Sequence, residues 1–520
     1  MVSMMRGILI TALALLAPFS ACAETLAAGT ALRLARGDLR IETAPGDYIA
    51  GRIEAGANPV DADLLAADGH HFRRIARSQS GTIPFRAVAE GPALILRLTA
   101  GAEVQVVLDQ QIPVAAQIPP APDYDSPRIA GLAAGLAQGE TTDRFWSQVA
   151  AEGTPMIEPA ANGEVLMTFL WRGAARNVRL FGAPSNDHEW LARLGESDVW
   201  FKTFRVPAST RLSYQLAPDI PDIPGDARAR RAAILATAQM DPLNHHPWPA
   251  DAADRFDMQA TVTLPAAPPQ PGTPPAADAD PVLEHFDFAS ATLGNSRSIT
   301  LSRPRDMDPA DPRIVLAFIF DGERAAGDLG VPAILDTLTR QGLLPPVVAV
   351  LIPSIDSKTR SRELPGNDAF ADALADELLP QVVARTGIRH DASRTVLAGA
   401  SYGGLAAATV AMRRPDAFGN VLSMSGSFWW APEGIDTDGT PFVAAELARQ
   451  DPLPLRFFLS AGSFETGRQG TAGILETSRI LRDILRLKAY PVTWREYSGG
   501  HDWLVWRGAL ADGLIAFFGQ

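Results

Sequence analysis

Short apolar runs alternate with segments of helical periodicity over the C-terminal half of the chain. Strand-like runs at 313–322, 347–356, 395–400 and 455–463 are each followed by a helix-like segment, at 331–341, 368–387, 405–414 and 474–488. Continuous apolar runs that alternate with helices are typical of a parallel sheet covered on both faces. We therefore predict that residues 283–520 form an α/β domain around such a sheet.

The N-terminal half has a different pattern, in which apolar and polar residues alternate with a period of two. Such runs over 24–112 and again over 140–222 predict two β-sandwich-like domains. Proline-rich stretches predict linkers at 113–139 and 223–282. The predicted fold class is thus an α/β domain preceded by two β-sandwich-like domains.

Residues 1–23 have the features of a secretory signal peptide. Arg6 precedes an apolar run too short to span a bilayer, and Ala21 and Ala23 form an A-x-A cleavage site. A second interpretation is a lipid anchor at Cys22, although Phe19 stands where a lipoprotein cleavage box usually has Leu. Cys22 is the only cysteine, so the processed chain is expected to contain no internal disulfide. We predict a periplasmic or secreted protein without a transmembrane segment.

The composition indicates a packed globular protein that does not bind nucleic acid. Hydrophobic residues make up 47% of the chain, which is enough to bury a core. The formal net charge is −13, from 46 Lys and Arg against 59 Asp and Glu, whereas nucleic-acid binding needs a basic surface. An anionic ligand would therefore need a local cluster of Arg or Lys.

Residues 399–403, GASYG, form a G-x-S-x-G motif between a predicted strand and a predicted helix. This context is that of the nucleophile elbow of α/β-hydrolases, in which a tight turn exposes a strained serine. The flanking glycines let the strand and the helix approach where a Cβ would clash. A serine hydroxyl needs a base, and His501 is the only histidine that follows Ser401. We predict that Ser401 is the nucleophile and His501 the base.

The acid that orients the base should lie between the nucleophile and the base, after a strand. Glu465 fits best, because it lies in the loop that follows the strand-like run 455–463. Asp436 and Asp438 follow no clear strand, and Asp502 adjoins the base itself. A different acid, or a Ser–His dyad without an acid, stays open as an alternative.

Acyl transfer also needs two N–H donors for the oxyanion of the tetrahedral intermediate. The backbone N–H of Tyr402, directly after the nucleophile, is predicted to be the first donor. The second is predicted in the loop after the strand-like run 313–322, at the backbone of Gly322 or Glu323.

Many short stretches between residues 140 and 520 resemble the enterochelin (enterobactin) esterases. They include TFLWRG (168–173), DVWFKTFRVP (198–207), RLSYQLAPD (211–219), MDPLN (240–244), FDGE (320–323), RSRELPGN (360–367), SGSFWW (425–430) and GGHDWLVWRG (499–508). The resemblance implies a serine esterase that hydrolyses the trilactone ester bonds of ferric tris-catecholate siderophores, such as enterobactin and salmochelin, to release iron. By resemblance, Ser401, His501 and Glu465 stand at the family's nucleophile, base and acid positions.

A ferric tris-catecholate is a trianion, so the resemblance also implies cations around the site. The candidate cations follow two of the strand-like runs, and they are Arg324, Lys358, Arg360 and Arg362. Arg360 stands at a position where the family usually has arginine. Trp429 and Trp430 are predicted to form an aromatic wall. The alternatives are surface ion pairing for the cations and core packing for the tryptophans.

No metal site or cofactor is predicted in the protein itself, so iron would arrive bound to the substrate. The adjacent pairs His70–His71 and His245–His246 have no third ligand at a helpful spacing. Two other functions stay open. One is a secreted carboxylesterase that acts on feruloyl or other acyl esters, and the other is a siderophore-binding protein that has lost catalysis.

Overall fold

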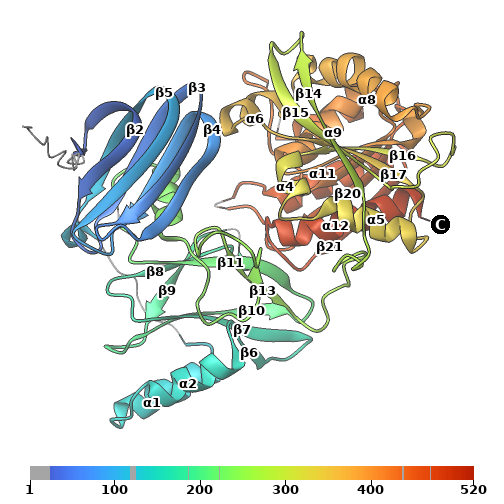
Figure 1. Cartoon of the computed structure of the whole chain (residues 1–520). Coiled ribbons are helices and arrows are strands. Elements are labelled where there is room, and N and C mark those ends of the chain that lie inside the picture. Colours follow the sequence, from blue (N-terminus) through green and yellow to red (C-terminus); the bar gives the residue numbers. More distant parts are fainter. Residues whose placement is uncertain are drawn as a thin grey trace, which may run out of the picture. The chain divides into compact units, whose positions relative to one another are not determined.

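The computed structural model describes residues 24–117, 124–185, 187–221, 223–435, 439–468 and 470–519. The predicted signal peptide and Cys22 lie outside these residues. The chain divides into two compact units, shown in Figure 1. The first is made mainly of residues up to Gln111, and the second runs from Ile112 to the C-terminus.

The first unit is a five-stranded sheet in the order β1-β2-β5-β3-β4. Its strands are β1 (Glu24–Thr25), β2 (Thr30–Glu42), β3 (Tyr48–Ala66), β4 (His71–Val88) and β5 (Ala93–Ile112). The period-two pattern places alternate side chains on one face, so that Leu39 and Ile41 are buried while Glu42 is exposed. The region for which we predicted a β-sandwich-like domain is thus β-rich, and its long strands form one five-stranded sheet.

The second β-rich region is an eight-stranded sheet in the order β12-β13-β11-β8-β9-β10-β7-β6. Its strands are β6 (Met156–Pro159), β7 (Glu164–Arg172), β8 (Val178–Phe181), β9 (Glu189–Arg193), β10 (Val199–Pro207), β11 (Arg211–Pro218), β12 (Pro247–Trp248) and β13 (Gln259–Thr263). Phe169 of β7 meets Tyr214 of β11 edge-on, with ring centroids 4.8 Å apart. Strands far apart in the sheet order thus share one core, which gives the sandwich-like arrangement.

The structure corrects the two predicted linkers. Residues 113–139 include a short 3₁₀ turn (Val114–Ala116) and helix α1 (Pro127–Ala137), which is followed by α2 (Asp143–Glu152). Residues 223–282 include helix α3 (Ala227–Thr237) and the strands β12 and β13. The side chain of Asp226 caps α3, and β13 pairs with β11, so α3 and β13 are ordered by contacts that proline content does not reveal.

The α/β domain contains an eight-stranded sheet in the order β14-β15-β17-β16-β18-β19-β20-β21. The strands are β14 (Val282–Ser290), β15 (Asn295–Arg303), β16 (Val315–Phe320), β17 (Val347–Ile352), β18 (Thr395–Ala400), β19 (Asn420–Met424), β20 (Arg456–Gly462) and β21 (Val492–Tyr497). The pairs from β17 to β21 are parallel, as predicted. The sheet is nevertheless mixed, because the hairpin β14–β15 joins β17 in the antiparallel sense.

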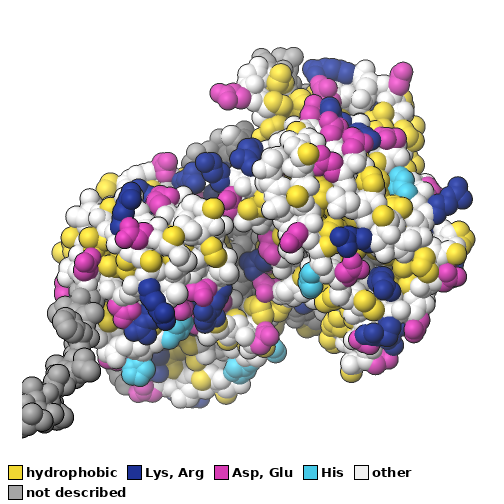
Figure 2. All heavy atoms as spheres, turned by 45° about the horizontal axis from the view of Figure 1, so that its top comes forward, with side chains coloured by type: hydrophobic (Ala, Val, Ile, Leu, Met, Phe, Trp, Pro, Cys, Tyr) yellow, Lys and Arg dark blue, Asp and Glu magenta, His cyan; other side chains and the backbone are white. Residues whose placement is uncertain are grey.

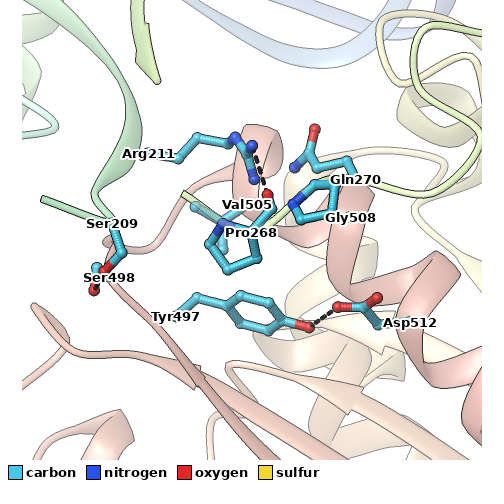
Figure 3. Close-up of a pocket in the computed structure, with 10 residues that line it drawn as sticks. Ser209, Arg211, Pro268, Gln270, Tyr497, Ser498, Val505, Gly508 and Asp512 are labelled. Atoms are coloured by element: carbon cyan, nitrogen blue, oxygen red, sulfur yellow. Dashed lines mark hydrogen bonds between the residues drawn. The ribbon is translucent and has the colours of Figure 1, made fainter. Parts of the chain in front are cut away.

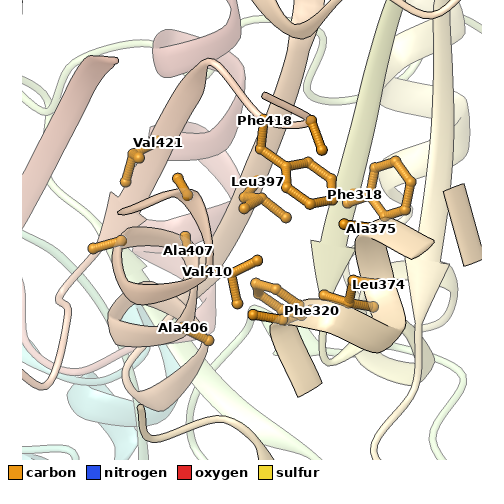
Figure 4. Packing of buried hydrophobic residues seen from close by; sticks show 14 of the residues in the cluster. Phe318, Phe320, Leu374, Ala375, Leu397, Ala406, Ala407, Val410, Phe418 and Val421 are labelled. Atoms are coloured by element: carbon orange, nitrogen blue, oxygen red, sulfur yellow. The ribbon is translucent and has the colours of Figure 1, made fainter. Parts of the chain in front are cut away.

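Helices cover both faces of this sheet, and alternate strand residues supply the two cores. The helices are α4 (Gly322–Ala326), α5 (Val331–Arg340), α6 (Ser357–Glu363), α7 (Asp368–Asp372), α8 (Leu379–Thr386), α9 (Tyr402–Arg413), α10 (Phe442–Arg449), α11 (Ile474–Leu487) and α12 (Trp503–Phe518), with a π-helical segment (Ala373–Leu378) between α7 and α8. Phe318 and Leu397 point to the face covered by α9, where Ala407 and Val410 pack (Figure 4). Ile319 points to the opposite face, which α4, α5 and α12 cover.

A polar joint connects β11 of the sandwich-like sheet to the segment before α12 (Figure 3). The Arg211 N–H donates to the Ser498 carbonyl oxygen at 2.9 Å, and the Ser209 and Ser498 hydroxyls lie 2.8 Å apart. The side-chain amide of Gln270 donates to the Leu504 carbonyl oxygen at 2.6 Å. Both ends of segment 498–504, which contains His501, are therefore held by the preceding domain.

On the face shown in Figure 2, Lys and Arg side chains are interspersed with Asp and Glu side chains. Neither sign forms an extended patch among the described residues drawn there. Over the part of the chain that the structure describes, we find no helix that is both long and apolar enough to cross a membrane.

Gly399→Ala should destabilise the α/β domain. A Cβ at position 399 would lie 2.6 Å from the backbone carbonyl of Gly403, and the backbone of α9 can move away only if the helix shifts. Overpacking of this kind typically costs about 1–3 kcal/mol. We expect a lower midpoint of thermal unfolding, measured by scanning calorimetry. Gly131→Ala in α1 is the control, because a Cβ there would meet no atom within 4 Å; equal losses in both variants would contradict the packing argument.

Candidate active site

Ser401 sits in a strained turn at the junction of β18 and α9. Its backbone angles are φ 58° and ψ −121°, a combination that residues other than glycine rarely adopt. The turn is held by hydrogen bonds from the Ser401 N–H to the Met424 carbonyl oxygen and from the Ser427 N–H to the Ser401 carbonyl oxygen, each 3.0 Å long. A Cβ at Gly404 would lie 2.6 Å from the Ser423 hydroxyl, so this close approach requires glycine. The motif thus adopts the conformation expected of a nucleophile elbow.

The predicted base and the predicted acid are in direct contact. The Nδ1–H of His501 donates to Glu465 Oε1 at 2.6 Å. The other carboxylate oxygen accepts hydrogen bonds from the Ser425 hydroxyl and from the Gly462 N–H, both at 2.6 Å. Glu465 is 1% exposed, so the carboxylate has a fixed orientation. Its donors leave one oxygen for the imidazole, which is the arrangement that sets the histidine tautomer.

Trp506 of α12 supports this pair from a second side. Its indole N–H donates to the Ser425 hydroxyl at 2.8 Å, and Ser425 in turn donates to Glu465. The Trp506 ring also meets the His501 ring edge-on, with centroids 4.6 Å apart. Sequence reasoning missed both Ser425 and Trp506 as positioning residues, because nothing local in the sequence shows that these segments meet.

Asp502 points away from His501 and holds the histidine segment to the sandwich-like domain. Its carboxylate accepts hydrogen bonds from the Ser213 N–H, from the Ser213 hydroxyl at 2.8 Å and from the Leu504 N–H at 2.8 Å. Burial raises the pKa of Asp502 despite these donors. Of the alternative acids, Asp502 is therefore directed elsewhere, whereas Asp436 and Asp438 lie outside the described residues.

Ser401 and His501 line one open cavity of about 460 Å³. The hydrogen-bond partner of the Ser401 hydroxyl in the described residues is Ser427, with the two oxygens 3.4 Å apart. Catalytic hydrogen bonds are often long or unformed before substrate binds. The cavity thus presents the hydroxyl and the imidazole to the same ligand.

The predicted oxyanion donors lie at the carboxyl ends of adjacent strands. Tyr402 is the first residue of α9 and Gly322 the first of α4, so neither N–H has an acceptor within its helix. A Cβ at Gly322 would lie 2.4 Å from the Ile352 nitrogen, which explains the glycine. The carboxylate of Glu323 accepts the Ser354 N–H at 3.0 Å, and burial raises the pKa of Glu323. Glu323 therefore orders this loop through its side chain.

Arg360 lines the cavity, but its guanidinium group is already paired. It binds Asp321 with two hydrogen bonds, of 2.6 and 2.8 Å, and lies 5.9 Å from the centre of the Tyr402 ring. Asp321 itself is buried and has a left-handed backbone (φ 54°) directly before Gly322. Arg360 thus fixes the loop that carries the second predicted oxyanion donor.

The other predicted binding residues divide into two groups. Arg324 lines the cavity, where it pairs with Asp328 and lies 5.9 Å from the centre of the Trp503 ring. The residues that the structure does not place in the cavity lining are Lys358, Arg362, Trp429 and Trp430. Arg362 lies 3.7 Å from Glu363, and Trp429 is 52% exposed beside Tyr402. Trp430 packs against the core beside Phe442.

The described residues contain no cluster of three or more His, Cys, Asp or Glu side chains that could hold a metal ion. Of the histidine pairs singled out in the sequence, His70 pairs with Asp68 at 2.9 Å, and His245 bonds to the Ala150 carbonyl oxygen at 3.1 Å. These histidines therefore make ordinary local contacts.

Comparison with known proteins gives concordant matches over the second unit. The family model described as "Enterochelin esterase, N-terminal" matches residues 166–273, and the one described as "Putative esterase" matches residues 290–517. The iron(III) enterobactin esterase of Dickeya dadantii is 34% identical over 430 residues, which cover 74% of this chain and 94% of that protein. The chain belongs to the enterochelin esterase family. It is accordingly a carboxylic ester hydrolase.

Another curated relative and two solved structures show the same likeness. The iron(III) salmochelin esterase of Escherichia coli O6:H1 is 32% identical and covers 74% of this chain and 96% of that protein. The crystal structure of the ferric enterobactin esterase of Salmonella typhimurium superposes with a TM-score of 0.61 at 32% identity and covers 72% of this chain and 98% of that one. The enterobactin esterase of Shigella flexneri, solved in the presence of enterobactin, gives a TM-score of 0.59 at 30% identity, with 72% and 97% covered.

Glu465→Gln should lower kcat by about 10³–10⁴-fold with little change in KM, because an amide cannot hold the imidazole in the required tautomer. The Ser425 and Gly462 donors already occupy one side of the carboxylate, so an amide nitrogen would face a donor on either side. The measurement is steady-state kinetics with a chromogenic aryl ester. The exposed Glu433→Gln is the control and should retain full activity; a Glu465→Gln enzyme of near-normal kcat would exclude this carboxylate as the acid.

Asp502→Asn should destabilise the protein and slow the enzyme together. One of the donors that now bonds to Asp502 would face an amide N–H, at a typical cost of about 1–3 kcal/mol. Because the next residue is His501, we expect a lower midpoint of thermal unfolding and a lower kcat. The exposed Asp451→Asn is the matched control. A variant that unfolds earlier but keeps its kcat at low temperature would contradict the positioning of His501 by this contact.

Proposed function

We propose that this enzyme hydrolyses the ester bonds of ferric tris-catecholate siderophores of the enterobactin and salmochelin type. The observation that carries the proposal is the joint match of both domains to proteins named iron(III) enterobactin and salmochelin esterases. The open cavity of about 460 Å³ that Ser401 and His501 share supports it, because a multi-armed substrate needs room beside the scissile bond.

In the proposed mechanism the Ser401 hydroxyl attacks a lactone carbonyl while His501 accepts its proton through Nε2. The Glu465 carboxylate, 2.6 Å from Nδ1, stabilises the imidazolium that forms. The backbone N–H groups of Tyr402 and Gly322 stabilise the oxyanion. His501 then protonates the departing seryl oxygen, and water activated by the same imidazole hydrolyses the acyl-enzyme and frees Ser401.

The alternative substrate class, feruloyl or other simple acyl esters, is less well supported. The match of residues 166–273 to the enterochelin esterase N-terminal family links this chain to siderophore esterases in particular. That domain also supplies part of the cavity wall, including Phe181, Leu212 and Tyr214. A binding protein without catalysis is disfavoured by the contact between His501 and Glu465 and by the strained turn at Ser401.

We further propose a periplasmic or secreted location, supported by the signal-peptide features of residues 1–23. A lipid anchor at Cys22 stays an alternative, and it would also place the protein outside the cytoplasm. In this proposal the protein carries no cofactor of its own, and iron enters and leaves with the siderophore.

Ser401→Ala should reduce trilactone hydrolysis by at least about 10³-fold, because it removes the proposed nucleophile. The measurement is product analysis by mass spectrometry after incubation with iron-loaded and iron-free trilactone. Ser361→Ala, an exposed serine on α6, is the control and should behave as the parent. Fast cleavage of aryl esters by the parent without any cleavage of the trilactone would refute the proposed substrate class.

A further inference from the structure

One wall of the active-site cavity is built by the sandwich-like domain rather than by the α/β domain. Phe181 ends β8, His188 directly precedes β9, and Arg231 lies on α3. Arg468, from the loop after β20, completes this part of the wall. None of these four residues takes part in the hydrogen bonds described above for Ser401, His501 or Glu465.

The cavity-lining arginines differ in whether their charge is already neutralised. Three of the four have a carboxylate partner, namely Arg360 with Asp321, Arg324 with Asp328, and Arg468 with Asp187. Arg231 has none among the described residues. Its guanidinium carbon instead lies 5.3 Å from the centre of the Phe181 ring. Arg231 is therefore a cation that faces the cavity and lacks a bound anion.

His188 lies beside Arg231 in this wall, and its pKa is lowered in part by the positive charges around it. The His188 ring stacks on Phe181 with centroids 4.7 Å apart. Burial, and after it the nearby cations of Arg231, Arg179 and Arg468, lower the pKa of His188 to about 4, against an opposing effect of Asp187. His188 is consequently neutral at pH 7, and the wall presents two guanidinium groups beside two stacked rings.

We propose that Arg231, together with Phe181, His188 and Arg468, forms a subsite for a catecholate arm of the substrate other than the arm whose ester lies at Ser401. The inference rests on the proposed function. A catecholate ring carries ionised oxygens on an aromatic face, and a planar guanidinium group can bind both. An anion held there would neutralise the cavity-lining arginine that has no carboxylate partner among the described residues, in a protein whose net charge of −13 otherwise repels a trianion.

The binding test uses the full chain with Ser401→Ala, so that the ligand is not cleaved. Ferric enterobactin is titrated against tryptophan fluorescence, and Arg231→Gln is expected to raise Kd by about tenfold, as for one lost charge-assisted contact. Arg228→Gln, an exposed arginine on the same helix outside the cavity, is the matched control and should bind as the parent does. A Kd for Arg231→Gln within twofold of the control would overturn the subsite, provided that thermal unfolding shows equal stability.

A kinetic test separates an arm subsite from a general effect at the scissile bond. With Ser401 intact, Arg231→Gln should lose more kcat/KM on the trilactone than on the methyl ester of 2,3-dihydroxybenzoyl-serine, which has a single arm. Arg231→Lys should recover part of the loss, because it restores the charge but not the planar group. Equal losses on both substrates would overturn the proposal. Failure of the parent enzyme to cleave the trilactone would instead refute the proposed function, so the two failures are distinguishable.

Discussion

The strained backbone of Ser401 is the constraint on which the rest of the site depends. A non-glycine residue at φ 58° and ψ −121° typically costs on the order of 1–3 kcal/mol, and it persists only because the surrounding packing leaves no other path. The chain must pass from the end of β18 into α9 where a Cβ at Gly399 or Gly404 would clash. The turn points the hydroxyl into the cavity, at the edge of the sheet where the other parallel strands also end.

Two carboxylates with separate hydrogen-bond networks hold His501, the proposed base, and the segment that contains it. Glu465 receives His501 on one oxygen and is anchored on the other, so the imidazole meets a fixed partner. Asp502, the residue after the base, is bound instead by Ser213 of the sandwich-like domain. The family's N-terminal domain therefore contributes to the active site in two ways, by positioning the histidine segment and by forming a cavity wall.

The positive charge that the cavity offers to a ligand depends on which of its arginines are paired with a carboxylate, rather than on how many arginines line it. Arg360 looks from the sequence like a substrate-binding cation, yet its two hydrogen bonds to Asp321 make it part of the loop that bears Gly322. The Arg360 guanidinium group is half-buried and paired, so the charge of Asp321 largely offsets its own. Among the described residues that line the cavity, the arginine without a carboxylate partner is Arg231, in a segment for which sequence analysis predicted no binding role. Which cation meets the ligand was therefore decided by where the carboxylates lie.

The sequence by itself determined the strand–helix alternation and the position of the strained serine, because periodicity and the G-x-S-x-G spacing are local. It also singled out His501 as the candidate base, because only one histidine follows Ser401. It also favoured Glu465 from its place after a strand. The tertiary structure alone decided that β13 and α3 are ordered, that Ser425 and Trp506 support Glu465, and that Asp502 turns toward Ser213. These are contacts between segments far apart in the chain. Each contact forms only when the fold brings both segments together, and a local sequence pattern contains no information about that distance.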